Sequence, residues 1–486
     1  MAPDLPIPDT RVLAVASHVV SGNVGNKIAV FTLQSLGCDV AALNTVQFTN
    51  DVRGRQGNHT GYRQWKGTKV SAQEIRDLFE GLKQSYLDDF DMMLSGYIPG
   101  AEAVMAVGDI AKELKAKSGD GSFFWVLDPV MGDNGKLYVA EEVVPAYQSL
   151  VEHADLILPN QFEAELLSGV KITDMNSLQS AIHALHSKFR IPHVVITSVN
   201  LAALDHPPSH LSVVGSSMDP STGAPRLFKI VFPAIDAYFS GTGDMFAALM
   251  TVRMREAVIA AGSQLQKTRS WLSGPEVDAL DLPLARAAEM VLASMHEVLT
   301  QTARGMQEAV GAAAAEASTE EEKKKLHLLK SKSAELKLVR NLACLRDPVS
   351  NTSAAEAAGA AHTLLELLDL DDLGGEDALD DKLGDTVTLS DLEVGVGVVE
   401  EEDLDLAAVV RVDDAGASVD EVLGGETGAR GNAAVCCGGF LISFLLPGYR
   451  SPSKVSYVQV PAGTEMAMSV LTRALPRAGM VVGFAA

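Results

Sequence analysis

The 486-residue chain has few of the residues that mark several common classes of protein. Its four cysteines match no zinc-binding spacing: Cys38, Cys344, Cys436 and Cys437. Basic residues number 39 against 63 acidic ones, and the net charge of -24 argues against a nucleic-acid or anionic-membrane surface. The longest C-terminal apolar stretch, 435–446, is too short to span a bilayer, and the N-terminus lacks the basic start of a secretory signal. We therefore expect a cytoplasmic protein with no nucleic-acid or membrane partner.

Aromatic residues are absent from a long C-terminal segment. Residues 349–439 contain no Phe, Trp or Tyr, and residues 349–486 carry 23 acidic residues against 7 basic ones. Acidic sequence that is poor in aromatics rarely buries enough surface to offset the entropy of ordering the chain. We therefore divide the chain into a folded domain, 11–348, and an acidic tail, 349–486. The tail is expected to be largely disordered, or else to be a gene-model artefact.

Up to about residue 350, strand-like apolar runs alternate with helical patterns. Strands are expected near 12–16, 39–44, 92–96, 123–127, 155–158 and 193–197, and helices near 27–37, 71–85, 101–116 and 163–169. This alternation is typical of an α/β fold whose mainly parallel sheet is covered by helices on both faces. Ligands of such sheets bind beyond the carboxyl ends of the strands. The polar residues that end these strands are therefore candidate site residues: Ser17, Tyr97, Asp128, Asn160 and Thr197.

A Walker A loop is missing, because the only Gly-Lys pair, Gly135-Lys136, lacks the preceding glycine frame. The best candidate for holding a phosphate is the run Gly241-Thr242-Gly243-Asp244, a glycine turn that opens a helix. A helix N-terminus offers backbone N–H groups and the positive end of a dipole to an anion. Asp244 follows where the proton of a substrate hydroxyl would be accepted, so the run is typical of phosphoryl transfer to an alcohol. Taken alone, it is equally compatible with an ordinary N-capped helix.

Two further groups of polar residues follow buried strands. Asp128 and Asp133 are hard oxygen ligands of the kind that Mg²⁺ uses together with phosphate and water, although two turn-forming aspartates are the simpler interpretation. Asn160 and Glu163 have the spacing of a helix capping arrangement and would alternatively act on a metal and its waters. Near the N-terminus, His18 is as compatible with a structural role as with a catalytic one.

Together these groups resemble the pyridoxal kinase family of the ribokinase-like superfamily, from Arg11 to Pro348. The resemblance rests on the order of the motifs SHVVSGNVGN, NTVQF, HTGY, WKG, SGY, DPVMGDNGKLYV, LPNQFEAELLSG, VVITS and GTGD, with Glu335–Arg340 similar to the family's closing segment. It implies a three-layer α/β/α sandwich with a β-hairpin flap, and a homodimer. The implied reaction is ATP-dependent phosphorylation of the 5′-hydroxyl of pyridoxal, pyridoxine and pyridoxamine, which gives pyridoxal 5′-phosphate in vitamin B6 salvage.

The resemblance also implies roles for individual residues. Asp244 would be the general base, and Gly241, Thr242 and Gly243 would form the anion hole. The remaining ATP-binding residues would be Asp128, Tyr138, Asn160, Glu163, Thr197 and Ser198. The substrate-binding residues would be Ser17, Val46, Phe48, Thr60 and Tyr97. ATP would act with Mg²⁺ and a monovalent cation, K⁺ or Na⁺, and Asp128, Asp133 and Glu163 would organise the metal.

The chain departs from the family pattern at two places. Residues Asp51–Asn58 are inserted before the HTGY motif, so we expect a longer flap and weaker vitamin binding. Leu158 stands where family members often have Thr, which removes an oxygen ligand from the monovalent-cation site. Two alternatives stay open: another ribokinase-like kinase such as a hydroxymethylpyrimidine kinase, and a catalytically impaired binding protein with a kinase fold.

Overall fold

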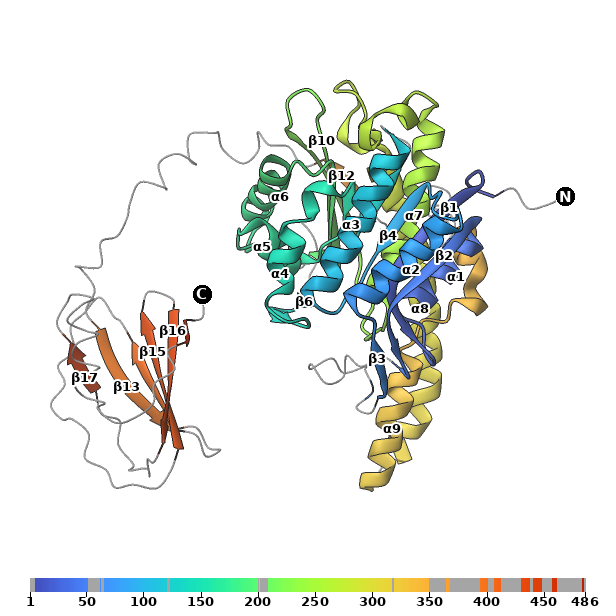
Figure 1. Ribbon diagram of the computed structural model, residues 1–486. Coiled ribbons are helices and arrows are strands. Elements are labelled where there is room, and N and C mark those ends of the chain that lie inside the picture. Colours follow the sequence, from blue (N-terminus) through green and yellow to red (C-terminus); the bar gives the residue numbers. More distant parts are fainter. Residues whose placement is uncertain are drawn as a thin grey trace. The chain divides into compact units, whose positions relative to one another are not determined.

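The computed structural model describes residues 5–50, 62, 65–119, 123–199, 201, 209–316 and 319–348, and short strands within 349–486. The chain divides into two compact units, Met1–Leu373 and Gly374–Ala486, and each is described by itself (Figure 1). No helix within the described part of the chain is both long enough and apolar enough to cross a membrane.

The first unit is built on a ten-stranded sheet whose centre is parallel. The strand order is β12-β11-β10-β9-β8-β5-β4-β1-β2-β3, and the pairs from β2 through β1, β4, β5 and β8 to β9 are all parallel. The strands are β1 (Thr10–Val19), β2 (Cys38–Phe48), β3 (Gly67–Lys69), β4 (Met92–Ser95), β5 (Phe124–Leu127), β8 (Leu156–Ile157), β9 (His193–Val199), β10 (His210–Met218), β11 (Pro225–Pro233) and β12 (Leu364–Leu367). Antiparallel strands extend both edges, with β3 beside β2 and β10, β11 and β12 beyond β9.

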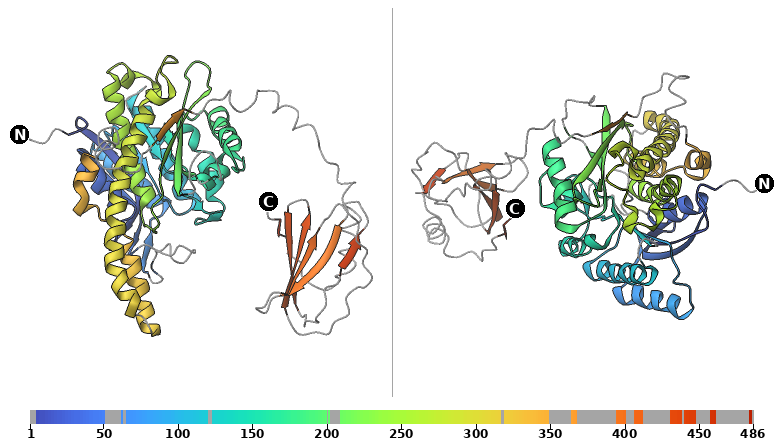
Figure 2. Two further views of the ribbon diagram at one scale, coloured as in Figure 1. Left: turned by 180° about the vertical axis from the view of Figure 1, so that it is seen from behind. Right: turned by 90° about the horizontal axis from the view of Figure 1, so that it is seen from above.

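Helices cover both faces of the sheet (Figure 2). They are α1 (Asn26–Ser35), α2 (Ala72–Gln84), α3 (Ala101–Ser118), α4 (Val143–Gln148), α5 (Gln161–Ser168), α6 (Met175–Phe189), α7 (Thr242–Ala261), α8 (Pro283–Glu316), α9 (Glu320–Ser333) and α10 (Leu342–Arg346), with short 3-10 turns at Val151–His153, Leu265–Lys267, Arg269–Trp271, Ala279–Asp281 and Val339–Asn341. Successive residues of a strand point to opposite faces. Val12 and Ala14 of β1 accordingly pack in one buried cluster with α1, α7 and α8, whereas Leu13 and Val15 pack in another with α2 to α6. The predicted three-layer α/β/α architecture with a mainly parallel sheet is confirmed.

Two hairpins lie near the carboxyl ends of the parallel strands. β6 (Gly132–Asp133) and β7 (Lys136–Leu137) form a small two-stranded sheet of their own. β2 and β3 pair antiparallel, with Val46 opposite Lys69 and Phe48 opposite Gly67, at the base of the expected flap. The inserted residues 51–58 lie outside the described residues.

Helices α8 and α9 run side by side as a long hairpin that extends below the sheet in Figure 1. Thr319 caps α9 by accepting a hydrogen bond from the N–H of Glu322, and the Glu322 side chain accepts one from the N–H of Thr319. The residues after α9 return to the body, where Ser240 and Glu335 form an isolated parallel bridge.

The second unit contains a six-stranded sheet in the order β17-β13-β14-β15-β16-β18. Its strands are β13 (Val394–Glu400), β14 (Leu406–Arg411), β15 (Arg430–Cys437), β16 (Phe440–Pro447), β17 (Tyr457–Val460) and β18 (Gly483–Phe484). Runs of Val and Leu favour extended structure, although the acidic composition led us to expect little order. Most of residues 349–486 lie outside the described residues, so a largely disordered tail stays a prediction.

Candidate active site

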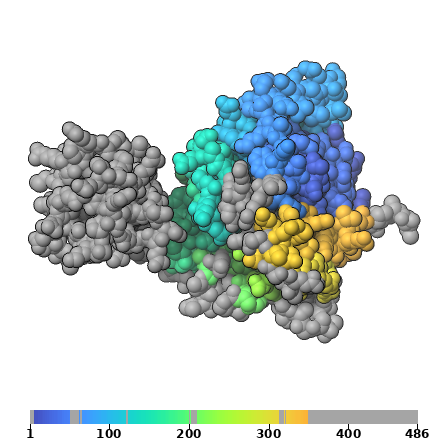
Figure 3. All heavy atoms as spheres, turned by 90° about the horizontal axis from the view of Figure 1, so that it is seen from below, coloured from blue at the N-terminus to red at the C-terminus, as the bar shows by residue number. Residues whose placement is uncertain are grey.

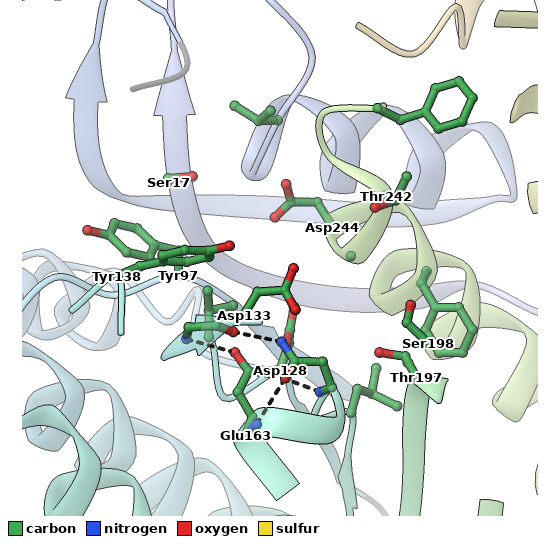
Figure 4. Close-up of a pocket in the computed structure, with 18 of the residues that line it drawn as sticks. Ser17, Tyr97, Asp128, Asp133, Tyr138, Glu163, Thr197, Ser198, Thr242 and Asp244 are labelled. Atoms are coloured by element: carbon green, nitrogen blue, oxygen red, sulfur yellow. Dashed lines mark hydrogen bonds between the residues drawn. The ribbon is translucent and has the colours of Figure 1, made fainter. Parts of the chain in front are cut away.

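A cavity of about 320 Å³ lies at the carboxyl ends of the parallel strands (Figure 4). Such a position is expected, because polar residues that end neighbouring parallel strands meet at one edge of the sheet. All the predicted site residues that the structure describes line this cavity, except Gly241: Ser17, Val46, Phe48, Tyr97, Asp128, Asp133, Tyr138, Asn160, Glu163, Thr197, Ser198, Thr242, Gly243 and Asp244. Thr60 lies outside the described residues.

Several lining residues were not among the predicted ones: Val19, Val24, Asn50, Val130, Gly132, Leu158, Phe239 and Phe246. Val19 and Val24 belong to the quoted motif SHVVSGNVGN, and Phe239 lies two residues before Gly241 of the GTGD turn. The motifs themselves could therefore have indicated these residues. Leu158 brings a hydrocarbon side chain to the wall at the position where an oxygen ligand was considered. His18 does not line the cavity.

The GTGD turn depends on glycine at position 241. Gly241 is the N-cap of α7 and has φ 85° and ψ 14°, a left-handed conformation that costs other residues free energy. A Cβ at this position would overlap the Ile28 side chain and lie 2.7 Å from the carbonyl oxygen of Asn23. The turn thus brings the first residues of α7 against the Asn23 turn. Because the first N–H groups of a helix have no acceptor within it, they are available to an anion.

Carboxyl groups gather opposite this helix N-terminus (Figure 4). Asp128 is buried, and its pKa is raised well above the usual range by burial and then by the neighbouring charges of Glu163 and Asp244. Burial also raises the pKa of Asp133, against a lowering effect of the N–H of Asn134. Burial therefore makes ionisation of these carboxyl groups unfavourable, and a bound cation would offset that cost.

Glu163 has a clear structural role. Its Oε1 accepts hydrogen bonds from the N–H groups of Met131 (2.8 Å) and Gly132 (3.3 Å), and its Oε2 accepts one from the N–H of Asn160 (2.9 Å). Asn160 in turn accepts the N–H of Glu163 through Oδ1, which completes the capping box of α5. Burial raises the pKa of Glu163 to about 7 against these hydrogen bonds.

No group of three or more His, Cys, Asp or Glu side chains among the described residues is arranged to hold a metal ion. The oxygens of Glu163 are already engaged by three backbone donors. A divalent cation here would therefore have few direct protein ligands, and phosphate and water would complete its coordination shell. Mg²⁺ is usually coordinated in this way in proteins.

The opposite end of the cavity is apolar and aromatic. Val19, Val24, Val46 and Phe48 form a buried cluster against which Trp65 and Tyr97 pack. The rings of Phe48 and Trp65 are 4.6 Å apart between centroids and tilted by 52°. Ser17 and Tyr97 add hydroxyl groups to this wall, and burial raises the pKa of Tyr97. Such a wall suits a flat ligand with a few polar substituents.

Comparison with known proteins identifies the family. Residues 77–268 match the family model described as phosphomethylpyrimidine kinase. Pyridoxal kinase of Ovis aries is 40% identical over 251 residues, which cover 50% of this chain and 76% of that protein. Pyridoxal kinase of Arabidopsis thaliana is 40% identical over 247 residues, 51% of this chain and 74% of that protein.

A solved structure agrees with these relatives. The pyridoxal kinase from Leishmania donovani in complex with ADP and pyridoxamine is 30% identical and superposes with a TM-score of 0.55, covering 74% of this chain and 100% of that chain. The chain therefore belongs to the pyridoxal kinase family of the ribokinase-like superfamily.

Proposed function

We propose that this protein transfers the γ-phosphoryl group of ATP to the 5′-hydroxyl of pyridoxal, and also of pyridoxine and pyridoxamine, in vitamin B6 salvage. One observation carries the proposal: the N-terminus of α7, with Asp244 in its first turn, opens into the same cavity as the aromatic wall around Phe48. The Leishmania donovani relatives were solved with ADP and either pyridoxamine or pyridoxine, which supports the choice of substrate class.

Asp244 is proposed as the general base. It would accept the proton of the 5′-hydroxyl while the hydroxyl oxygen forms a bond to the γ-phosphorus and the bond to the ADP oxygen breaks. Gly241, Thr242 and Gly243 would hold the transferring phosphoryl group through backbone N–H groups. Little covalent work is needed from the protein, because phosphoryl transfer depends mainly on positioning and neutralisation of charge.

The nucleotide and the vitamin would occupy opposite ends of the cavity. Asn160, Thr197 and Ser198 would contact the nucleotide, and Tyr138 would lie at the nucleotide-side rim. At the other end Ser17, Val46, Phe48 and Tyr97 would contact the pyridine ring, together with Thr60. The aromatic wall excludes water from the acceptor end, which strengthens electrostatic interactions there.

Asp128 and Asp133 fit a role in holding Mg²⁺, and Glu163 would act by fixing the Met131–Gly132 turn beside them. Their raised pKa values support this assignment, because such carboxyl groups release protons when a cation binds. Bound Mg²⁺ would neutralise the phosphate charge that builds up during transfer. We also propose a monovalent cation, K⁺ or Na⁺, although Leu158 offers it no side-chain oxygen.

A second candidate substrate is a hydroxymethylpyrimidine, because the matching family model is described as phosphomethylpyrimidine kinase. Both substrates are flat rings with a hydroxymethyl group, so the aromatic wall alone does not separate them. The Ovis aries and Arabidopsis thaliana relatives, which match over 251 and 247 residues, are pyridoxal kinases, which favours pyridoxal. A catalytically impaired binding protein is the remaining alternative.

The test is an assay of ATP-dependent phosphorylation with the purified full chain, offering pyridoxal and hydroxymethylpyrimidine in parallel. Formation of pyridoxal 5′-phosphate by the wild type, and its loss in Asp244→Ala, supports the proposal. Preferred phosphorylation of hydroxymethylpyrimidine would replace the proposed substrate. No turnover of either, with ATP still bound, would favour the binding protein. The same assay on residues 1–348 tests whether the tail is needed.

We further propose that the protein works as a homodimer in the cytoplasm. The resemblance to the family supports the dimer. Light scattering coupled to size-exclusion chromatography tests the first, and fractionation of cells that express the tagged chain tests the second.

A further inference from the structure

The segment Ala334–Leu336, which follows α9, joins two turns of the site that are far apart in the sequence. The N–H of Ser240 donates a hydrogen bond to the carbonyl of Ala334 at 3.0 Å, directly before the GTGD turn. The Asn23 side chain donates through Nδ2 to the carbonyl of Leu336 at 2.9 Å. Ser240 and Leu336 are buried, so both contacts are shielded from water. Figure 3 shows the yellow-orange C-terminal helices lying against the blue N-terminal region on this face.

The side chain of Glu335 extends this junction toward the substrate side. Its Oε1 accepts a hydrogen bond from the Tyr62 hydroxyl at 2.9 Å. Gly22 lies so close that a Cβ there would be 3.0 Å from the same oxygen. The backbone of Glu335 is bridged to Ser240, on the phosphate side. One residue thus contacts the Gly22 turn, Tyr62 of the HTGY motif and Ser240, which directly precedes the GTGD turn.

Glu335 does not line the cavity, so it would act through the groups that it touches. A hydrogen bond to an ionised carboxylate is stronger than one between neutral groups, and it fixes the donor more tightly. Phosphoryl transfer requires the acceptor hydroxyl and the phosphorus within a fraction of an ångström of the reactive geometry. A tie between the two sides of the cavity would therefore affect the rate without touching either substrate.

We propose that Glu335 is a positioning residue, which fixes Tyr62 and the Gly22–Asn23 turn relative to the GTGD turn. This inference rests on the proposed kinase function for its kinetic consequences. It predicts that loss of the carboxylate acts on the vitamin side more than on the nucleotide side. In the sequence, Gly22 lies between Val19 and Val24 of the aromatic wall, and Tyr62 lies three residues before Trp65.

The test compares Glu335→Ala, Glu335→Gln, Tyr62→Phe and the double variant Tyr62→Phe/Glu335→Ala in the full chain. Glu335→Ala is expected to lower kcat/KM for pyridoxal about tenfold, the scale of one hydrogen bond to a charged group, with the KM for ATP changed less than about twofold. Glu335→Gln keeps an oxygen acceptor and should recover most of the activity. The double variant should be no worse than the single ones, because both remove the same hydrogen bond. Glu308→Ala, an exposed carboxylate on α8, is the matched control.

A second readout does not need turnover. Trp65 follows Tyr62 by three residues and packs on Phe48, so its fluorescence, isolated by subtracting the spectrum of Trp65→Phe in the same background, reports on this segment. We expect its emission to shift in Glu335→Ala and Tyr62→Phe and to stay unchanged in Glu335→Gln and Glu308→Ala. Equal effects on pyridoxal and ATP, additive losses in the double variant, or an unshifted Trp65 emission would overturn the inference. If the wild type does not phosphorylate pyridoxal, the proposed substrate is wrong. The Trp65 emission of the variants then tests the positioning role of Glu335 without turnover.

Discussion

Replacing Gly243 by alanine separates the proposed phosphate-binding role of the GTGD turn from its structural role. Gly243 is the second residue of α7, and a Cβ there would meet nothing nearer than Oδ2 of Asp128, at 4.0 Å. Alanine is favoured over glycine in a helix by up to about 1 kcal/mol. For a unit of this size, with an unfolding entropy of roughly 2 cal/mol/K per residue, that free energy corresponds to a rise in Tm of no more than about 2 °C.

The methyl group would nevertheless project into the space between the helix N-terminus and Asp128. A phosphoryl group held there would be displaced by about 1 Å, and errors of that size cost roughly 100-fold in rate. We therefore expect Gly243→Ala to melt at or above the wild-type temperature while kcat/KM for ATP falls about 100-fold. Steady-state kinetics and thermal melts of the same preparation measure both quantities.

Gly241→Ala is the matched comparison, because its left-handed backbone and its contact with Asn23 make it costly to the fold. Strain and overpacking together amount to about 2–5 kcal/mol, which would lower Tm by roughly 3–6 °C. Activity of Gly243→Ala within about threefold of the wild type, or a fall in Tm as large as that of Gly241→Ala, would refute the reasoning.

Three further predictions concern the base, the nucleotide end and acid stability. Asp244→Asn should lower kcat by about 10²–10⁴-fold while nucleotide binding measured by calorimetry persists, and near-normal turnover would contradict the assignment. Ser198 has φ 55°, so Ser198→Gly should stabilise the fold by about 1 kcal/mol in thermal melts but raise the KM for ATP about fivefold if its hydroxyl binds phosphate. Burial lowers the pKa of His186 to about 4 and of His193 to about 3, so both stay neutral in the folded protein while the unfolded chain takes up protons below its own histidine pKa. The free energy of unfolding should therefore be highest above pH ~6.5 and decrease as the pH falls. For each histidine the decrease is about 1.4 kcal/mol per pH unit, down to the pKa of that histidine in the folded protein. An unchanged free energy of unfolding between about pH 6.5 and 5, measured by chemical denaturation, would contradict this.

The parallel part of the sheet could be predicted from the sequence, because each buried strand there is a continuous apolar run. The polar residue that ends each run could be assigned to the site without coordinates, since carboxyl ends of parallel strands meet at one edge. Asp128, Asn160 and Thr197 were found in this way and line the cavity. The capping arrangement of Asn160 and Glu163 was likewise readable from their spacing.

The strands β10 and β11 and the helix α6 between β8 and β9 were not anticipated. β10 contains buried serines that interrupt its apolar pattern, so its sequence does not indicate a core strand. Ser216 hydrogen-bonds to His186 at 2.8 Å and Ser217 to His193 at 2.8 Å, which satisfies these polar groups in the interior. Pairing between side chains so distant in sequence is not visible in local periodicity.

The lining residues that were missed belong mostly to loops placed by tertiary packing. Val24 and Phe239 come from two turns that lie next to each other at the cavity, and neither directly follows a strand end as Asp128, Asn160 and Thr197 do. Glu335 lay in a segment whose resemblance to the family was noted, but its contact with Gly22 joins residues more than 300 positions apart. Such contacts depend on the folded topology rather than on any motif.

The segment Ala334–Leu336, which joins the Asn23 turn to the GTGD turn, has a consequence for the order in which the protein folds. The hydrogen bond from Asn23 to Leu336 spans 313 residues, so the ribosome must release almost the whole kinase unit before it can form. The central parallel strands pair over much shorter separations and can assemble during synthesis. During translation the nascent chain would hold a sheet with most of the residues that line the cavity in place, and the two turns would be joined only at the end. Chains that stop before residue 336 should consequently retain much of the sheet yet lack an ordered phosphate turn.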